Sequence, residues 1–426
     1  MRRGGGLPGA GFVAPGLRAA LLATCWAVSL AWTSGARADA GFERCLAGLR
    51  GDALARGVSA ATFDRITRDL QPDMSVLERL DYQPEFKLPI WDYLAALVDD
   101  ERVAEGRAML ARWRDTLGKV ESEYGVDAAT VVAVWGVESN YGKSFGKRPL
   151  LTSLSTLSCY GRRQPFFRGE FLTTLRIVDE GHLQPDRLVG SWAGAFGHTQ
   201  FMPSTFMRIA VDFDGDGRRD IVDSIPDALA STANYLRRSG WRDGQTWGYE
   251  VRLPSGFDES LAGRKSKRAL SQWSALGVRA LLPGQGKAGA SASAQSQGMA
   301  ADAKAGLLLP AGPQGPAFLV FRNFDAIYSY NAAESYALAI AHLADQLRGG
   351  GAFITPWPTD DVGLSRAGRR ELQTLLVLRG HDIGEIDGMI GSRSREAIKA
   401  EEQRLGMTPS GRAGQKILRL LRDEKR

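Results

Sequence analysis

Apolar residues recur at intervals of three and four over the first part of the chain. Between Phe42 and Gly125, segments such as "TFDRITRDL" and "DYLAALVDDERVAEGRAMLARWRDTLGKVESEYG" place these residues on one face of a helix. Short stretches with Gly, Pro or Ser separate the segments. The pattern predicts a series of connected helices, and therefore a mainly α fold.

The pattern changes after Trp247. The segments "WGYEVRLP" and "AFLVFRNFDAIYSYN" contain alternating, β-branched or aromatic residues, which predict a small β element. Between them, residues 283–306 are poor in apolar residues and rich in Gly, Ala, Ser and Gln, so we predict a flexible insertion loop. The segment "SYALAIAHLADQL" then returns to the helical pattern and ends the first domain, residues 39–348.

The last part of the chain forms a separate unit. "RGGGAFITPWPTDD" combines three glycines and two prolines, so residues 349–363 are expected to be a linker. Three apolar-periodic segments follow and predict a small three-helix domain at residues 364–426. This domain has 14 Lys and Arg against 9 Asp and Glu. That excess favours an anionic polymer, either cell wall or nucleic acid, and a solvated basic surface is the alternative.

The N-terminus has the pattern of an export signal. Arg2, Arg3 and Arg18 precede an apolar run over residues 19–32, and small residues follow at positions 36 and 38. This arrangement is typical of a secretory signal peptide, residues 1–38. The apolar run is shorter than the roughly 20 residues that span a bilayer, so we expect an exported protein without a membrane span.

Three cysteines leave two alternatives open. "LATC", ending at Cys25, resembles the box before a lipid-modified cysteine, although threonine is unusual there, so an outer-membrane lipoprotein is the alternative to a soluble exported protein. Removal of the signal peptide leaves Cys45 and Cys159. Two cysteines in an oxidising compartment can pair, but the sequence does not show whether these two lie within bonding distance.

Glu138 stands out in the stretch "VVAVWGVESNYG", where it follows seven uncharged residues. We expect its helix to begin at Asp127, a suitable N-cap. Positions three and four residues before Glu138 are Trp135 and Val134, so the carboxyl shares an apolar stripe in the last helical turn. Both the apolar surroundings and the helix dipole disfavour the ionised form. We therefore predict a raised pKa and a proton donor; a solvent-facing glutamate without a role is the alternative.

The segment "DFDGDGRRDIVD" has the spacing of a twelve-residue calcium loop. Acids occupy positions one, three, five, nine and twelve, glycine position six, and a backbone carbonyl is expected at position seven. A solvated acidic turn is the alternative. The expected ligands are Asp212, Asp214, Asp216, the carbonyl of Arg218, and Asp223.

The motif around Glu138 resembles that of a known family. "GVESNYG", followed by "GSWAGAFGHTQFMPSTF", is similar to the catalytic signature of the lytic murein transglycosylases of the B family. "TLSCYGRRQPFFRGE", "STANYLRRSGW" and "YNAAESYALA" extend this resemblance over most of residues 42–347. The resemblance implies a lysozyme-like catalytic domain in which Glu138 is the sole acid and base.

The resemblance also implies roles for other residues. Gln200 and Ser191 would line the cleft, three tyrosines would hold sugar rings, Asn331 would bind an N-acetyl group, and two arginines would meet peptide-stem carboxylates. Phe166 and Tyr82 stand where the family has further aromatics. By the same similarity, Asp227 competes with Asp223 as the last calcium ligand, in a structural site without an organic cofactor. The expected substrate-binding residues are Ser191, Gln200, Tyr235, Tyr330, Asn331, Tyr336, Arg162 and Arg163.

The implied activity needs only one carboxylate. Lytic transglycosylases cleave between N-acetylmuramic acid and N-acetylglucosamine, and the C6 hydroxyl of the muramic acid replaces water as nucleophile and closes a 1,6-anhydro ring. A hydrolytic muramidase on the same fold, with a second acid opposite Glu138, is one alternative. A non-catalytic wall-binding protein is the other.

The tail resembles the small peptidoglycan-binding domain of wall enzymes. "LQ" at 372–373, "DG" at 387–388 and "AI" at 397–398 fit, whereas Glu401 and Glu402 depart from the pattern. The implied partner is the peptidoglycan glycan strand rather than nucleic acid, and the implied compartment is the periplasm.

Overall fold

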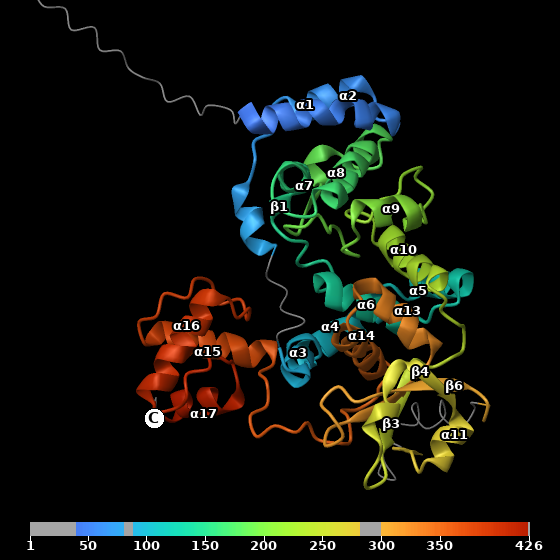
Figure 1. Ribbon diagram of the computed structural model, residues 1–426, viewed down its shortest axis with the longest axis vertical. Coiled ribbons are helices and arrows are strands. Elements are labelled where there is room, and N and C mark those ends of the chain that lie inside the picture. The colour runs from blue at the N-terminus through green and yellow to red at the C-terminus, as the bar shows by residue number, and fades with distance from the viewer. Residues whose placement is uncertain (1–39, 81–87, 282–299, 425–426) are drawn as a thin grey trace, which may run out of the picture. The chain divides into compact units, whose positions relative to one another are not determined.

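The computed structural model describes residues 40–80, 88–281 and 300–424. The expected signal peptide, the lipoprotein box at Cys25, Tyr82 and residues 283–299 of the expected insertion lie outside these ranges. The described chain is mainly helical, as predicted, with two small antiparallel sheets (Figure 1). None of its described helices is both long and apolar enough to cross a membrane.

The helices and strands follow one another along the chain in a fixed order. The helices are α1 (Ala40–Ala55), α2 (Ala60–Thr67), η1 (Met74–Arg79), α3 (Ile90–Leu97), α4 (Asp100–Arg112), α5 (Arg114–Tyr124), α6 (Ala128–Ser139), α7 (Leu150–Cys159), α8 (Gln164–Asp179), η3 (Pro185–Arg187), α9 (Pro203–Ile209), α10 (Ile225–Arg238), η4 (Glu259–Leu261), α11 (Leu270–Ala275), α13 (Arg322–Asn331), α14 (Glu334–Leu347), α15 (Arg366–Leu378), α16 (Ser392–Arg404) and α17 (Gln415–Asp423). The strands are β1 (Arg148–Pro149), β2 (Val189–Gly190), β3 (Gly248–Arg252), β4 (Gly263–Ala269), β5 (Arg279–Ala280), β6 (Lys304–Leu308) and β7 (Ala317–Val320).

Helix α6 lies at the centre of the first domain. The side chain of Asp127 caps it by accepting the N–H of Thr130 at 3.0 Å, as the sequence predicted. Its residues are apolar on all sides, and such a helix is stable only when it is enclosed. Helices α4, α5, α10 and α14 pack around it (Figure 1). Val131, Val134 and Trp135 are buried.

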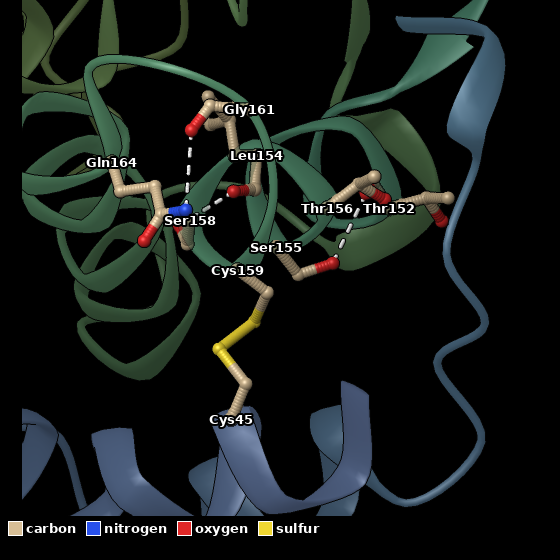
Figure 2. Close-up of a disulfide and its surroundings, with 9 residues drawn as sticks. All are labelled: Cys45, Thr152, Leu154, Ser155, Thr156, Ser158, Cys159, Gly161 and Gln164. Atoms are coloured by element: carbon tan, nitrogen blue, oxygen red, sulfur yellow. Dashed lines mark hydrogen bonds between the residues drawn. A yellow bond between two sulfur atoms is a disulfide. The ribbon is translucent and has the colours of Figure 1, made fainter. Parts of the chain in front are cut away.

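A second core forms around α7 and α8 and includes apolar residues of α1. Cys45 of α1 and Cys159, the last residue of α7, are joined by a disulfide with a Cα–Cα distance of 5.8 Å, so the pairing that the sequence left open is formed (Figure 2). Tyr235 and Tyr330 are half-buried and pack against both this core and the one around α6. The junction of the two cores is therefore lined by aromatic side chains.

The β element has five antiparallel strands in the order β4-β6-β7-β3-β5. Strand β3 confirms the prediction for "WGYEVRLP". In "AFLVFRNFDAIYSYN" only β7 is a strand; the prediction is wrong for α13, where Phe324 and Ile327, three residues apart, bury one helical face. The predicted C-terminal bound of the flexible insertion, residue 306, is also wrong, because β6 already begins at Lys304 and Ala305 is fully buried.

The expected linker is bound to the first domain. The carboxylate of Glu250 on β3 accepts the N–H groups of Ile354 and Thr355, both at 2.7 Å, and the ring of Phe353 stacks on His342. These contacts attach residues 353–355 to β3 and α14 of the first domain.

Helices α15, α16 and α17 form the predicted three-helix domain around a core that contains Leu372, Ile398 and Leu418. Glu402, one of the two acids that depart from the expected pattern, is buried and accepts the N–H of Ser410 and of Gly411. It therefore stabilises the loop before α17.

Candidate active site

Glu138 lies in the last turn of α6, where the chain reverses direction. Tyr336, a buried residue of α14, donates a hydrogen bond to Glu138 Oε1. Burial raises the pKa of Glu138 to about 7, while the hydrogen bond from Tyr336 opposes this rise because it stabilises the ionised form. The predicted raised pKa is thus confirmed, and the carboxyl can donate and accept a proton near neutral pH.

Three tyrosines form a row beside this carboxyl. The ring centroids of Tyr336 and Tyr330 are 6.3 Å apart, and those of Tyr330 and Tyr235 are 4.6 Å apart. The hydroxyl of Tyr330 donates to the carbonyl of Thr199 at 2.8 Å, and that of Tyr235 to the carbonyl of Ser329 at 2.7 Å. The fold therefore brings together four residues that the sequence singled out, from α6, α10, α13 and α14.

The loop of residues 190–201 reaches this row through Thr199. Its two candidate residues hold the loop in shape: Ser191 Oγ accepts the N–H of Ala195 at 3.0 Å, and Gln200 Nε2 donates to the carbonyl of Gly197 at 3.0 Å. Gly197 has a φ of 70°, and a Cβ there would lie 2.5 Å from the carbonyl oxygen of Ile221, so only glycine fits.

His198 connects this loop to α6, a role that the sequence did not reveal. Its Nδ1 accepts a hydrogen bond from Trp135 Nε1 at 2.9 Å, and its carbonyl accepts one from Ser139 Oγ at 2.8 Å. Burial lowers the pKa of His198 to about 4, so the ring stays neutral and keeps its acceptor. It is one of four histidines and lies inside the motif, but its function depends on a tryptophan 63 residues away.

The two candidate arginines have different contacts. Arg162 donates to the carbonyl of Leu80. The guanidinium of Arg163 lies 4.6 Å above the ring of Phe166, which is 41% exposed. This pair places a positive charge and an aromatic face at the start of α8. Asn331 is exposed at the end of α13, next to Tyr330.

Among the residues that the structure describes, no carboxylate shifts the pKa of Glu138. Tyr336 is the only titratable side chain there that shifts the pKa of Glu138. The buried Glu170 in the motif "TLSCYGRRQPFFRGE" is used elsewhere: it accepts the N–H of Ser204 at 2.9 Å and its hydroxyl at 2.7 Å. Glu170 thus caps α9.

The acidic loop brings three carboxylates together. Oxygens of Asp212, Asp214 and Asp227 lie within 4.8 Å of one another. Asp227 is buried, and its carboxylate also accepts the backbone N–H groups of Phe213 and Asp220. A group of carboxylate oxygens at this spacing fits a hard cation such as Ca²⁺.

The other expected ligands have different partners. Asp216 pairs with Arg218 at 3.0 Å, and Asp223 forms a two-pronged pair with Arg187, with one contact at 2.9 Å. Of the two competing candidates for the last ligand, the N-terminus of α10 carries Asp227 into the cluster, whereas Asp223 lies before that helix and pairs with Arg187. The choice between them as cation ligands stays a prediction.

Comparison with known proteins agrees with this geometry. Residues 41–345 match the family described as "Transglycosylase SLT domain". The chain belongs to this family. Its SLT domain is followed by a match to "Putative peptidoglycan binding domain" at residues 365–421.

Individual relatives extend the SLT comparison. The chain is 33% identical over 258 residues to membrane-bound lytic murein transglycosylase B of Escherichia coli (strain K12), an alignment that covers 59% of this chain and 65% of that protein. The solved structure of SltB3 from Pseudomonas aeruginosa with NAG-anhNAM-pentapeptide is 47% identical, with a TM-score of 0.69, over 89% of this chain and 99% of that one. The Escherichia coli lytic transglycosylase Slt35 in complex with calcium is 29% identical, with a TM-score of 0.59, over 72% and 93%.

Proposed function

We propose that this protein is a lytic murein transglycosylase. It cleaves the β-1,4 bond between N-acetylmuramic acid and N-acetylglucosamine and leaves 1,6-anhydromuramic acid ends. The observation that carries this proposal is Glu138, a carboxyl with a pKa of about 7 and no second carboxylate acting on it within the described ranges. Such a group suits a reaction in which one residue is first the acid and then the base.

In the first step, the protonated carboxyl of Glu138 donates its proton to the glycosidic oxygen. The C1–O bond breaks, and N-acetylglucosamine leaves with a free hydroxyl. Positive charge develops at C1 of the muramic acid, where the acetamido oxygen of the substrate stabilises it. Tyr336 holds Oε1 and stabilises the carboxylate that this step creates.

In the second step, the carboxylate of Glu138 takes the proton of the muramic acid's C6 hydroxyl. The oxygen of that hydroxyl forms the new bond to C1, so the ring closes without water and Glu138 returns to its protonated state. The nucleophile is already part of the substrate, which makes the attack intramolecular.

The row of Tyr235, Tyr330 and Tyr336 provides aromatic faces for the sugar rings. Ser191, Gln200 and Asn331 provide neutral hydrogen-bonding groups beside them. Arg162 and Arg163 meet the carboxylates of the peptide stem.

A calcium ion bound by Asp212, Asp214 and Asp227 would hold the loop of residues 212–227 in shape. In this role the ion stabilises the segment before α10, the helix that carries Tyr235. The ion takes no part in the cleavage.

The C-terminal domain, residues 364–426, binds the peptidoglycan strand and keeps the catalytic domain on the polymer. The relatives act on murein, and the N-terminal pattern is that of an exported protein, so the proposed compartment is the periplasm.

The test is mass spectrometry of murein sacculi digested by the purified protein. We expect anhydro-muropeptides, which contain one water less than the reducing products of a hydrolase. Reducing ends throughout would refute the transglycosylase and support the hydrolytic muramidase.

A pair of variants tests the role of Glu138 in the same assay. Glu138→Gln cannot donate the proton, so digestion should stop. Glu334→Gln is the matched control, because Glu334 is an exposed acid on α14 outside the proposed site, and its product pattern should stay that of the wild type. Digestion by Glu138→Gln at the control rate would remove Glu138 from the mechanism.

A further inference from the structure

The turn directly after Glu138 has an unusual backbone. Asn140 and Tyr141 have φ values of 51° and 57°, and Gly142 follows with 84°. The left-handed region costs free energy for residues other than glycine and persists only where surrounding contacts impose it. The contacts that hold this turn therefore also hold the end of α6, two residues from the catalytic carboxyl.

One of these contacts comes from within the first domain. The hydroxyl of Tyr141 donates to the carbonyl of Arg102 on α4 at 2.7 Å, and its ring meets the ring of Trp135 edge-on at 5.7 Å. A Cβ on Gly106 of α4 would lie 2.5 Å from the Tyr141 hydroxyl. The second residue of the turn is thus packed tightly against α4.

The contact to the first residue of the turn comes from the C-terminal domain. Arg366, the first residue of α15, donates from Nη2 to Asn140 Oδ1 at 2.9 Å. Its backbone N–H donates to Asp99 Oδ2 at 3.0 Å, and the other oxygen of Asp99 caps α4 by accepting the N–H of Arg102 at 2.9 Å. Arg366 therefore touches both the turn and the helix that supports the turn.

Other contacts between the two domains lie away from the turn. Arg370 pairs with Glu101, and Arg412 pairs with Asp92 of α3, with one contact at 2.6 Å. These pairs attach the C-terminal domain to the first domain but do not contact residues 140–142. A variant that removes one of them therefore weakens the attachment of the domain without removing a contact to the turn.

We propose that Arg366 is a positioning residue for Glu138, through which the C-terminal domain holds the catalytic carboxyl in place as well as binding the wall. This inference rests on the proposed transglycosylase function. It predicts that loss of the Arg366 side chain slows the chemical step even on a substrate too small to need a second binding domain.

The experiment measures kcat and KM on a soluble muropeptide tetrasaccharide. For Arg366→Ala we expect kcat to fall about tenfold, because small displacements of a reacting group have large effects on rate, with KM changed less than twofold. A looser turn should also admit water to Glu138, which stabilises the ionised carboxylate and lowers its pKa. The basic limb of the pH profile should therefore move below pH 7. Arg366→Lys, which keeps the charge, should recover part of kcat.

Arg370→Ala is the matched control, because it removes an arginine of the same interface that does not touch the turn. It should keep the wild-type kcat and pH profile on the soluble fragment. Equal kcat values and pH profiles in Arg366→Ala and Arg370→Ala would overturn the inference.

Asn140→Gly, which leaves Arg366 in place, keeps the test valid if Arg366→Ala folds poorly, because it breaks the same contact and should by itself lower kcat about tenfold. A double-mutant cycle then tests whether the two residues act through one contact. Asn140→Gly removes the acceptor and tolerates the positive φ, so Arg366→Ala should cause no further loss of kcat in that background. A further tenfold loss would contradict the inference. If the wild type itself yields no anhydro product, the proposed function fails instead, which is a separate outcome.

Discussion

Replacement of Tyr336 by phenylalanine tests how the site sets the pKa of Glu138. The substitution removes one hydroxyl and keeps the ring that buries the carboxyl, so the desolvation that raises the pKa remains while the hydrogen bond that lowers it is lost. Hydrogen bonds to charged groups contribute about 1.5–3 kcal/mol, and one pKa unit corresponds to about 1.4 kcal/mol. The pKa should therefore rise from about 7 by roughly one to two units.

The consequence appears in the pH dependence of kcat. In the proposed mechanism Glu138 must be protonated to start the reaction, so kcat should fall as the pH rises through the pKa of Glu138. In Tyr336→Phe this basic limb should move to about pH 8 or above, measured as the rate of anhydro-product formation from a soluble muropeptide. Tyr330→Phe is the control, because that hydroxyl binds the carbonyl of Thr199 and its loss should leave the limb near pH 7. A limb that stays in place or moves down in Tyr336→Phe would refute the reasoning.

Three further predictions concern stability. The pKa of Glu138 is raised from 4.5 to about 7, so the folded state loses stability as the pH rises through this window, by at most about 3 kcal/mol. Glu138→Gln should therefore melt several degrees above the wild type at pH 8 but not at pH 4. An equal difference in melting temperature at both pH values would contradict this. Calcium at about one hundred times its Kd should raise the free energy of unfolding by about 2.7 kcal/mol in scanning calorimetry, an effect that Asp227→Asn should abolish and Asp223→Asn should keep, and the reverse pattern would remove Asp227 from the site. The disulfide of Cys45 and Cys159 closes a separation of 114 residues, so replacing both by alanine should lower the free energy of unfolding in urea by about 5 kcal/mol, and an unchanged midpoint would show that the bond does not stabilise the fold.

Helix α6, which carries Glu138, was predictable from local pattern. Asp127 is a strong N-cap, and the apolar stripe below Glu138 indicated both the helix and the raised pKa, because these properties depend on residues within four positions of one another. The three C-terminal helices were predictable for the same reason. By contrast, α13 was mistaken for a strand, since its aromatic residues fit either period and only packing beneath α14 decides between them.

Contacts between distant segments were not predictable. The spacing of a calcium loop selected Asp223 and the family resemblance offered Asp227, but only the direction of α10 shows that Asp227 lies in the cluster while Asp223 pairs with Arg187. Histidine is a polar residue type. The ring of His198 stays neutral because it is buried, and it accepts a hydrogen bond because Trp135 Nε1 lies opposite its Nδ1.

The sequence by itself determined the family and the mainly helical fold, and it singled out Glu138 as the proposed catalytic residue, because motif and periodicity are local properties of the chain. The tertiary structure alone decided which partners each side chain has: Tyr336 for Glu138, Cys159 for Cys45, and Arg366 for Asn140 across 226 residues. The physical reason is that pKa values, ligand sets and backbone strain depend on which groups meet in space.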